Sequence, residues 1–220
     1  MTGEITNSGT ITIDESFTPT DTDTDGDLDG PFAQGSGRFG IRVLGPGTFT
    51  GNIGNSGTIT VEGNQSGGLV VDSALSGTLN VSGTIKVLGN DSVGVKADDV
   101  SDNVILSTGT IEVQGGNSVG VALNGDIGGA LVIQNAIQNT GYRYTQVPAD
   151  TSKLDADDLL QGGSALVVAG SVGGGILFDA RPADNSTTDT DEDDDGVLDA
   201  NETTATILTV GSAPAAIAAS

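Results

Sequence analysis

The chain has 220 residues, with 30 acidic and seven basic side chains and a net charge of −23, and it contains neither cysteine nor histidine. These counts exclude a disulfide framework, a zinc site built from cysteine and histidine, and catalysis by a Ser-His-Asp or Cys-His arrangement. The acidic charge disfavours nucleic acids and anionic membranes as partners, and no run of 18 apolar residues predicts a membrane-spanning helix.

Glycine accounts for 35 residues and aromatic residues for only 3% of the chain. Isoleucine, valine and threonine, which favour strands, alternate with glycine, asparagine, aspartate and serine, which favour turns. This composition predicts an all-β protein made of many short strands. The chain ends abruptly in the apolar stretch SAPAAIAAS, so we expect it to be a segment of a longer protein.

The first 55 residues contain three alternating runs and one insert. The runs are GTITI at 9–13, FGIRV at 39–43 and GNIGN at 51–55, and the insert covers about residues 14–38. In this insert aspartates alternate with other residues around Gly26: Asp21, Asp23, Asp25, Asp27 and Asp29. The pattern resembles the calcium loops of thrombospondin type 3 and dockerin-like repeats. Position twelve is Phe32, so Asp14, Glu15 or water would have to complete a Ca²⁺ site.

Residues 57–133 contain three copies of a 26-residue unit. The copies begin GTITVEGNQSGGLVV, GTIKVLGNDSVGVKA and GTIEVQGGNSVGVAL. Each copy holds three alternating runs, which in the first copy are 57–61, 67–71 and 77–81. Alternation places every second residue, such as Ile59 and Val61, on one face of its strand. Because equivalent residues recur every 26 positions, each run is expected to pair in parallel with its equivalent in the next copy, ~4.8 Å away.

We therefore predict an all-β parallel β-helix, a solenoid with three short strands per ~26-residue coil. Right-handed coiling is the commoner choice for coils of this length. A β-sandwich is disfavoured because each run resembles the third run after it and not its neighbour. Propeller blades are disfavoured because they need about 40 residues and aromatic side chains.

Beyond residue 133 the pattern continues with two further inserts. Runs at 136–138, 164–168, 173–178, 205–210 and 213–218 extend the coils, and the inserts cover about 139–163 and 180–204. We expect residues 1–220 to form a single solenoid domain. The first two inserts fall between first and second strands, so both should protrude from one edge, and the third should leave another corner.

The third insert matches the complete D-x-[DN]-x-[DN]-G-x5-E pattern of an EF-hand loop around Gly196. Its expected Ca²⁺ ligands are Asp191, Asp193, Asp195, Val197 through its carbonyl, Asp199 and Glu202. Such spacing turns alternate oxygens toward one centre, and Ca²⁺ takes six to eight oxygen ligands. The loop resembles an EF-hand loop without the flanking helices, because TTATILTV after it is typical of a strand. The alternative for both acidic loops is a solvated surface that keeps the protein soluble.

The middle insert differs from the other two. It carries Tyr142, Arg143 and Tyr144, a cluster suited to stacking on carbohydrate, and the stretch 154–160 (LDADDLL), which is compatible with one helical turn. The alternative is that the tyrosines simply cover a corner of the solenoid.

The GTITVEGN…SVGV repeats and the three inserts resemble passenger regions of bacterial autotransporter-type surface proteins, of the kind found in sphingomonad-like Gram-negative bacteria. The resemblance covers nearly the whole chain. It implies an extracellular location on the bacterial cell surface, with a signal peptide and an outer-membrane barrel in the parent protein. It implies no shared activity for this region.

These observations predict a non-enzymatic structural or adhesive surface segment, a stalk, adhesin or filament-forming scaffold whose loops are stabilised by Ca²⁺. Its expected partners are further copies, end to end or laterally, and a glycan or host-surface ligand. Two alternatives stay open: a β-helix polysaccharide lyase or hydrolase, and a calcium-dependent glycan-binding module. Lyase chemistry needs a basic residue beside the calcium, and Arg38, Arg42 and Arg181 are nearest to the acidic loops.

Overall fold

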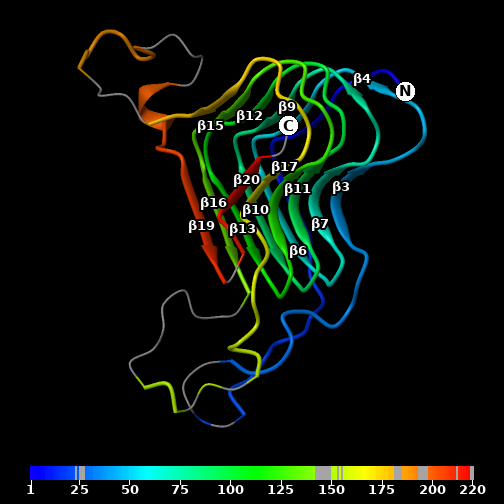
Figure 1. Ribbon diagram of the computed structural model, residues 1–220, viewed down its shortest axis with the longest axis vertical. Coiled ribbons are helices and arrows are strands. Elements are labelled where there is room, and N and C mark those ends of the chain that lie inside the picture. The colour runs from blue at the N-terminus through cyan, green and yellow to red at the C-terminus, as the bar shows by residue number, and fades with distance from the viewer. Residues whose placement is uncertain are drawn as a thin grey trace.

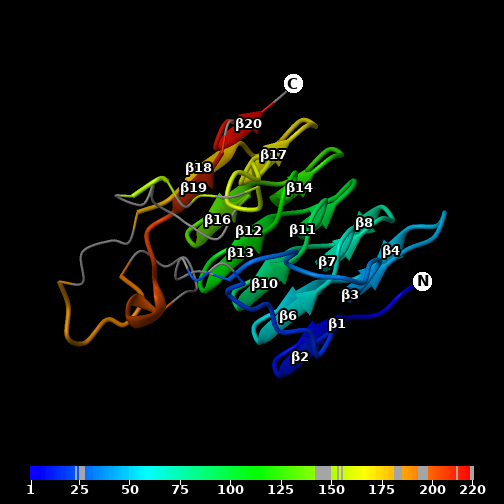
Figure 2. The same cartoon turned by 90° about the horizontal axis from the view of Figure 1, so that it is seen from below.

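The computed structural model describes residues 1–22, 24, 28–141, 150–152, 154, 156–180, 185–192, 198–211 and 213–218. The chain passes in turn through three sheets of parallel strands and then repeats the same path one coil further along the axis (Figure 1, Figure 2). Within the described residues each of these three sheets has six strands, and all pairings between their strands are parallel. The predicted parallel β-helix with three strands per coil is therefore confirmed.

Each coil contributes one strand to each sheet. The first sheet contains β2 (Thr10–Ile13), β6 (Thr58–Glu62), β10 (Thr84–Leu88), β13 (Thr110–Gln114), β16 (Ala136–Thr140) and β19 (Thr206–Val210). The second contains β3 (Phe39–Val43), β7 (Gly67–Val71), β11 (Val93–Ala97), β14 (Val119–Leu123), β17 (Leu166–Val168) and β20 (Ala216–Ala218). The third contains β1 (Ile5–Asn7), β5 (Ile53–Asn55), β9 (Leu79–Val81), β12 (Val104–Leu106), β15 (Leu131–Ile133) and β18 (Ile176–Phe178).

The 26-residue register is confirmed in the first sheet. Ile59 pairs with Ile85 and Ile85 with Ile111, and all three side chains are fully buried. The third sheet departs from this interval, because Leu79 pairs with Val104 and Val104 with Leu131, which are 25 and 27 residues apart. Relative to the 26-residue interval, one residue is absent and later one is added, and both changes fall in the connections between strands. The buried positions of the strands therefore stay aligned.

The weaker copies on both sides of the repeat also join the sheets at the predicted places. β2 pairs with β6 and β3 with β7 upstream, while β17, β18 and β19 extend the three sheets downstream. β16 continues through Asn139 and Thr140, so the connection after it begins at Gly141, two residues later than the expected 139. The reason is that the amide of Asn139 is buried and donates to the carbonyl of Gly163 (2.8 Å), which holds the strand end in place.

A fourth, very short ladder fills the corner between the second and third sheets. It consists of β4 (Phe49–Thr50) paired with β8 (Leu75–Ser76), continued by single bridges through Val100, Ile127 and Val172. Phe49, Leu75, Val100 and Ile127 are buried in the common core. The sequence did not predict this ladder, because one apolar residue per coil produces no alternation.

Glycine in the second sheet makes room for the first sheet. A Cβ atom added to Gly94 would lie 2.6 Å from Cγ2 of Ile111 and 2.5 Å from the carbonyl oxygen of Gly120. Gly68 and Gly120 occupy the same position in the neighbouring coils and face Ile85 and Ile137. Each isoleucine therefore packs into space that any larger residue at the glycine position would fill.

Serine residues satisfy the buried backbone at the corner between the first and second sheets. Ser66, Ser92 and Ser118 are buried. The hydroxyl of Ser92 accepts the backbone N–H of Ser66, and the hydroxyl of Ser118 accepts the backbone N–H of Ser92 (both 3.1 Å). The residue before each serine has a left-handed backbone: Gln65 (φ 48°), Asp91 (φ 55°) and Asn117 (φ 58°). Polar residues at these positions tolerate that conformation, which makes the tight corner possible.

The first and second inserts both connect the first sheet to the second, and the third connects β18 to β19. In Figure 1 the described parts of the first two lie together beyond one end of the strands, and the third lies apart from them. The third insert is closed at its base, since the N–H of Ala205 donates to the carbonyl of Asp179 (2.9 Å).

Candidate functional site

The two acidic loops are closed by equivalent backbone hydrogen bonds. In the first insert the N–H of Asp29 donates to the carbonyl of Thr20 (3.1 Å), and in the third the N–H of Asp199 donates to the carbonyl of Thr190 (2.9 Å). Asp29 and Asp199 both stand at position nine of the expected calcium pattern. Two loops that are far apart in sequence and leave different corners of the solenoid therefore share one backbone closure.

The side chains at position nine also make equivalent hydrogen bonds in the two loops. Asp29 accepts the N–H of Thr22, and Asp199 accepts the N–H of Glu192 through Oδ1 (3.0 Å). Thr22 and Glu192 both stand at position two. The apolar residues at position eight, Leu28 and Leu198, are both exposed. The sequence predicted the acidic spacing of these loops, whereas the closing role of the ninth residue emerges only from the structure.

Two described carboxylates at the end of the third acidic loop, those of Asp199 and Glu202, are buried. Asp199 retains 6% and Glu202 4% of its possible exposure; Asp199 is the first residue of a short 3-10 helix, η1 (Asp199–Asn201), and Glu202 directly follows it. Thr203, the next residue, donates its hydroxyl to the carbonyl of Gln134, which fixes this end of the loop to the solenoid. Burying carboxylates is costly unless donors or a cation compensate their charge. The charges of Asp199 and Glu202 therefore have to be compensated within the folded protein.

The first loop lacks this arrangement. Phe32, at position twelve, lines a hollow with Phe17, Pro19 and Leu28 against Leu88 of the first sheet, so its side chain packs there and supplies no carboxylate. The expected outside ligand Glu15 is used elsewhere. Its carboxylate accepts the N–H groups of Gln34 and Gly35 (both 2.7 Å) and pairs with Arg38 (2.9 Å).

The eleven expected metal ligands are only partly described. Asp21, Asp29, Asp191, Asp199 and Glu202 are described, and Asp23, Asp25, Asp27, Asp193, Asp195 and Val197 lie outside the described residues. Among the residues that are described, no three acidic side chains are grouped so that they could hold a metal ion. The Oδ1 of Asp21 accepts the N–H of Thr24 (2.6 Å), which curls the start of the first loop.

The middle insert is hydrogen-bonded to the first insert. The N–H of Gly30, next to the first acidic loop, donates to Oδ2 of Asp157 (2.7 Å) across 127 residues of sequence. Residues 156–159 form a turn with a hydrogen bond from the N–H of Leu160 to the carbonyl of Asp157 (3.4 Å), and this turn does not extend into a helix. The cluster of Tyr142, Arg143 and Tyr144 lies outside the described residues.

A separate charged cluster lies on the outer face of the second sheet. Asp72 pairs with Arg42 (2.8 Å) and Lys96 (2.5 Å), and the guanidinium of Arg42 stacks on Phe39 (4.1 Å). Burial by itself raises the pKa of Asp72, but the hydrogen bonds and charges of Lys96 and Arg42 outweigh it and hold that pKa below its ordinary value. This cluster joins neighbouring coils and has the geometry of a structural ion pair.

Asp72→Asn is expected to lower the free energy of unfolding at pH 7 by about 0.5–1 kcal/mol. Because the pKa of Asp72 is depressed in the folded state, its contribution is present above the unfolded pKa and is lost as pH falls through the folded pKa. The difference between the variant and the parent protein should therefore shrink in acid. Urea denaturation at several pH values measures it, with the exposed Asp102→Asn as control; a difference independent of pH would contradict the assignment.

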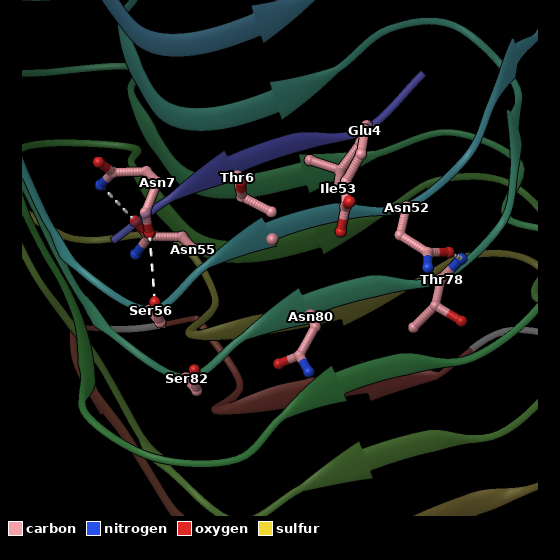
Figure 3. A pocket seen from close by; sticks show the side chains of 11 residues that line it. Glu4, Thr6, Asn7, Asn52, Ile53, Asn55, Ser56, Thr78, Asn80 and Ser82 are labelled. Atoms are coloured by element: carbon pink, nitrogen blue, oxygen red, sulfur yellow. Dashed lines mark hydrogen bonds between the residues drawn. The ribbon is translucent and has the colours of Figure 1, made fainter. Parts of the chain in front are cut away.

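A hollow on the outer face of the third sheet carries no sequence motif. It has a volume of about 260 Å³ and lies over β1, β5 and β9 (Figure 3). Among the described residues that line it, Glu4 is the only charged one. Sequence reasoning missed it because Thr6, Gly54 and Asn80, at its centre, occupy ordinary outward-facing strand positions, and their proximity depends on how the coils stack.

Neither protein-family models, curated proteins nor solved structures match this chain. None of the helices in the described ranges has the length and apolarity needed to cross a bilayer.

Proposed function

We propose that this chain is a structural or adhesive segment of an extracellular bacterial surface protein, in which Ca²⁺ stabilises the acidic loops. The observation that supports this most directly is the shared closure of the loops at Asp29 and Asp199, presented at two corners of one solenoid. The solenoid is a scaffold, and its loops are the parts available to partners. A glycan or host-surface ligand and further copies of the chain are the partners that this proposal entails.

A regular solenoid suits the scaffold role for a physical reason. One buried ladder of the first sheet consists of isoleucine in four successive coils, from Ile59 to Ile137, so the core is continuous along the axis. Each coil contacts mainly its neighbours, which makes the stack stiff and extendable. Inserts at the corners then protrude without disturbing the ladders.

Calcium is the cation that suits the loop chemistry. The expected ligands are carboxylate and carbonyl oxygens, which Ca²⁺ prefers, and the pattern contains no nitrogen or sulfur donor. In the third insert Asp191, Asp193, Asp195, Val197, Asp199 and Glu202 would hold the ion. Asp21, Asp23, Asp25, Asp27 and Asp29 would hold one in the first insert, with water in place of the missing twelfth ligand. Bound Ca²⁺ would offset the repulsion among these carboxylates.

Calorimetric titration of the chelator-treated protein with CaCl₂ tests the proposal. Asp199→Asn is expected to weaken the tighter site by about 10- to 100-fold, because it removes the charge of an expected ligand while leaving an Oδ1 that can still accept the N–H of Glu192. Asp102→Asn, an exposed acid outside the inserts, serves as the matched control and should titrate like the parent protein. Arg181 is the one basic residue within 180–204. If Arg181→Gln unfolds the loop and no calcium heat is found, the counter-ion is the arginine and the calcium proposal fails.

Hydrogen exchange gives an independent readout of the same proposal. Removing Ca²⁺ is expected to speed exchange at residues 185–202 while the strands within 57–133 keep their protection, because the ladders do not depend on the loops. Simultaneous opening of both regions would contradict this separation of loop from core.

A further inference from the structure

The hollow on the third sheet arises from one missing side chain. Thr6, Gly54 and Asn80 occupy consecutive outward positions of β1, β5 and β9, paired in register. A Cβ atom added to Gly54 would have only Cγ2 of Thr6 and the carbonyl of Asn80 within 4 Å, both at 3.8 Å. Thr6 and Asn80 therefore wall a groove whose floor is the backbone of β5, as Figure 3 shows.

The groove presents neutral hydrogen-bonding groups to solvent. The side chains of Thr6, Thr78 and Asn80 make no hydrogen bond within the described part of the chain, so their donors and acceptors are available to a ligand. Asn52 stands beside Thr78, and its Oδ1 accepts the N–H of Thr78 (3.0 Å), which orients the amide (Figure 3). Amides and hydroxyls both donate and accept hydrogen bonds.

The floor of the groove is rigid. Ile53 and Asn55, on either side of Gly54, are buried, with exposed fractions of 0% and 1%. The amide of Asn55 accepts from Nδ2 of Asn7 (2.7 Å) and donates to the carbonyl of Gly57 (3.2 Å). A ligand would meet walls held by paired strands, so little conformational entropy would be lost on binding.

These features select the class of ligand. The backbone groups of β5 are already paired with β1 and β9, so a peptide cannot be added to the sheet here as a further strand. The net charge of −23 and the carboxylate of Glu4 repel uronates and sulfated chains. A chain rich in neutral hydroxyl groups is complementary to the exposed amides and hydroxyls.

We propose that this groove, walled by Thr6 and Asn80 over Gly54, binds neutral glycan. The site is separate from the acidic loops and needs no calcium. It goes beyond the proposed scaffold role, because it assigns a ligand class to a sheet face and not to an insert.

The test is binding of the whole chain to immobilised neutral, amino-sugar and uronate oligosaccharides, each with CaCl₂ and with EGTA. Binding to neutral oligosaccharides, unchanged by EGTA, is the expected result. Gly54→Gln should raise the Kd by about tenfold or more by filling the groove. Val132→Gln, an outward position of the same sheet three coils away, should leave binding unchanged. Unchanged melting temperatures for both variants would show that the fold is intact.

Three outcomes would overturn the proposal: no neutral oligosaccharide binds, Gly54→Gln binds as the parent protein does, or only amino sugars bind. The third outcome would assign recognition to the carboxylate of Glu4. Binding that disappears in EGTA and in Asp199→Asn would place the glycan on the calcium loops and would also refute this groove. Failure of the calcium titration alone leaves the groove prediction intact, so the two proposals fail separately.

Discussion

Replacing Gly94 with alanine is expected to lower the free energy of unfolding by about 3 kcal/mol or more. The added Cβ would lie 2.5 Å from the carbonyl oxygen of Gly120 and 2.6 Å from Cγ2 of Ile111. The first is backbone of the neighbouring strand and the second belongs to a β-branched side chain, which has few alternative rotamers in a packed core. Relief therefore requires the coils to move apart.

Urea denaturation followed by circular dichroism measures this loss, and Gly54→Ala is its matched control. Gly54 also lies in a strand of the solenoid, but its Cβ would meet its nearest atoms at an ordinary 3.8 Å. The control is expected to be neutral or more stable by up to about 1 kcal/mol, because alanine restricts the unfolded chain. Equal losses in the two variants would mean that glycine is needed for flexibility and not for space.

Ile111→Ala is expected to cost about 3–4 kcal/mol. Ile111 is fully buried and is sandwiched between Ile85 and Ile137 in the first sheet. Removing three carbon atoms leaves a cavity that the flanking coils cannot fill, since their hydrogen-bonded ladders fix the spacing between strands. Because coils stabilise mainly their neighbours, hydrogen exchange should increase most in β10, β13 and β16.

The control for this prediction is Ile11→Ala. Ile11 holds the equivalent position of β2, at the end of the same ladder, and is only partly buried. Its replacement should cost clearly less, about 1–2 kcal/mol, because less apolar surface returns to water. A loss as large as that of Ile111→Ala would indicate that the solenoid unfolds as one unit irrespective of position.

The fold was predictable from the sequence because each coil of the solenoid corresponds to one repeat of the sequence. Ile59, Ile85 and Ile111 recur at the interval that stacks one on another, and parallel pairing then follows from the period alone. The corner ladder through Phe49 and Leu75 was not predictable, because a single apolar residue between turns gives no period-2 signal.

The candidate sites, like the fold, were predictable from the sequence only in part. The spacing of acidic residues identified the loops, since ligand spacing is local in sequence. The equivalence of Asp29 and Asp199 as closing residues depends on backbone conformation, and the bond between Gly30 and Asp157 joins two inserts 127 residues apart. The engagement of Glu15 by Gln34, Gly35 and Arg38 likewise follows from the folded path of the first insert.

The sequence by itself determined the all-β class, the 26-residue coil, the three sheets and the places where the chain departs from them. It could do so because alternation and period are properties of neighbouring residues and of fixed intervals. Only the tertiary structure decided why Gly94 must be glycine, which carboxylates are buried, and that Thr6, Gly54 and Asn80 meet in one groove. These depend on distances between atoms of different coils, which stacking alone brings together.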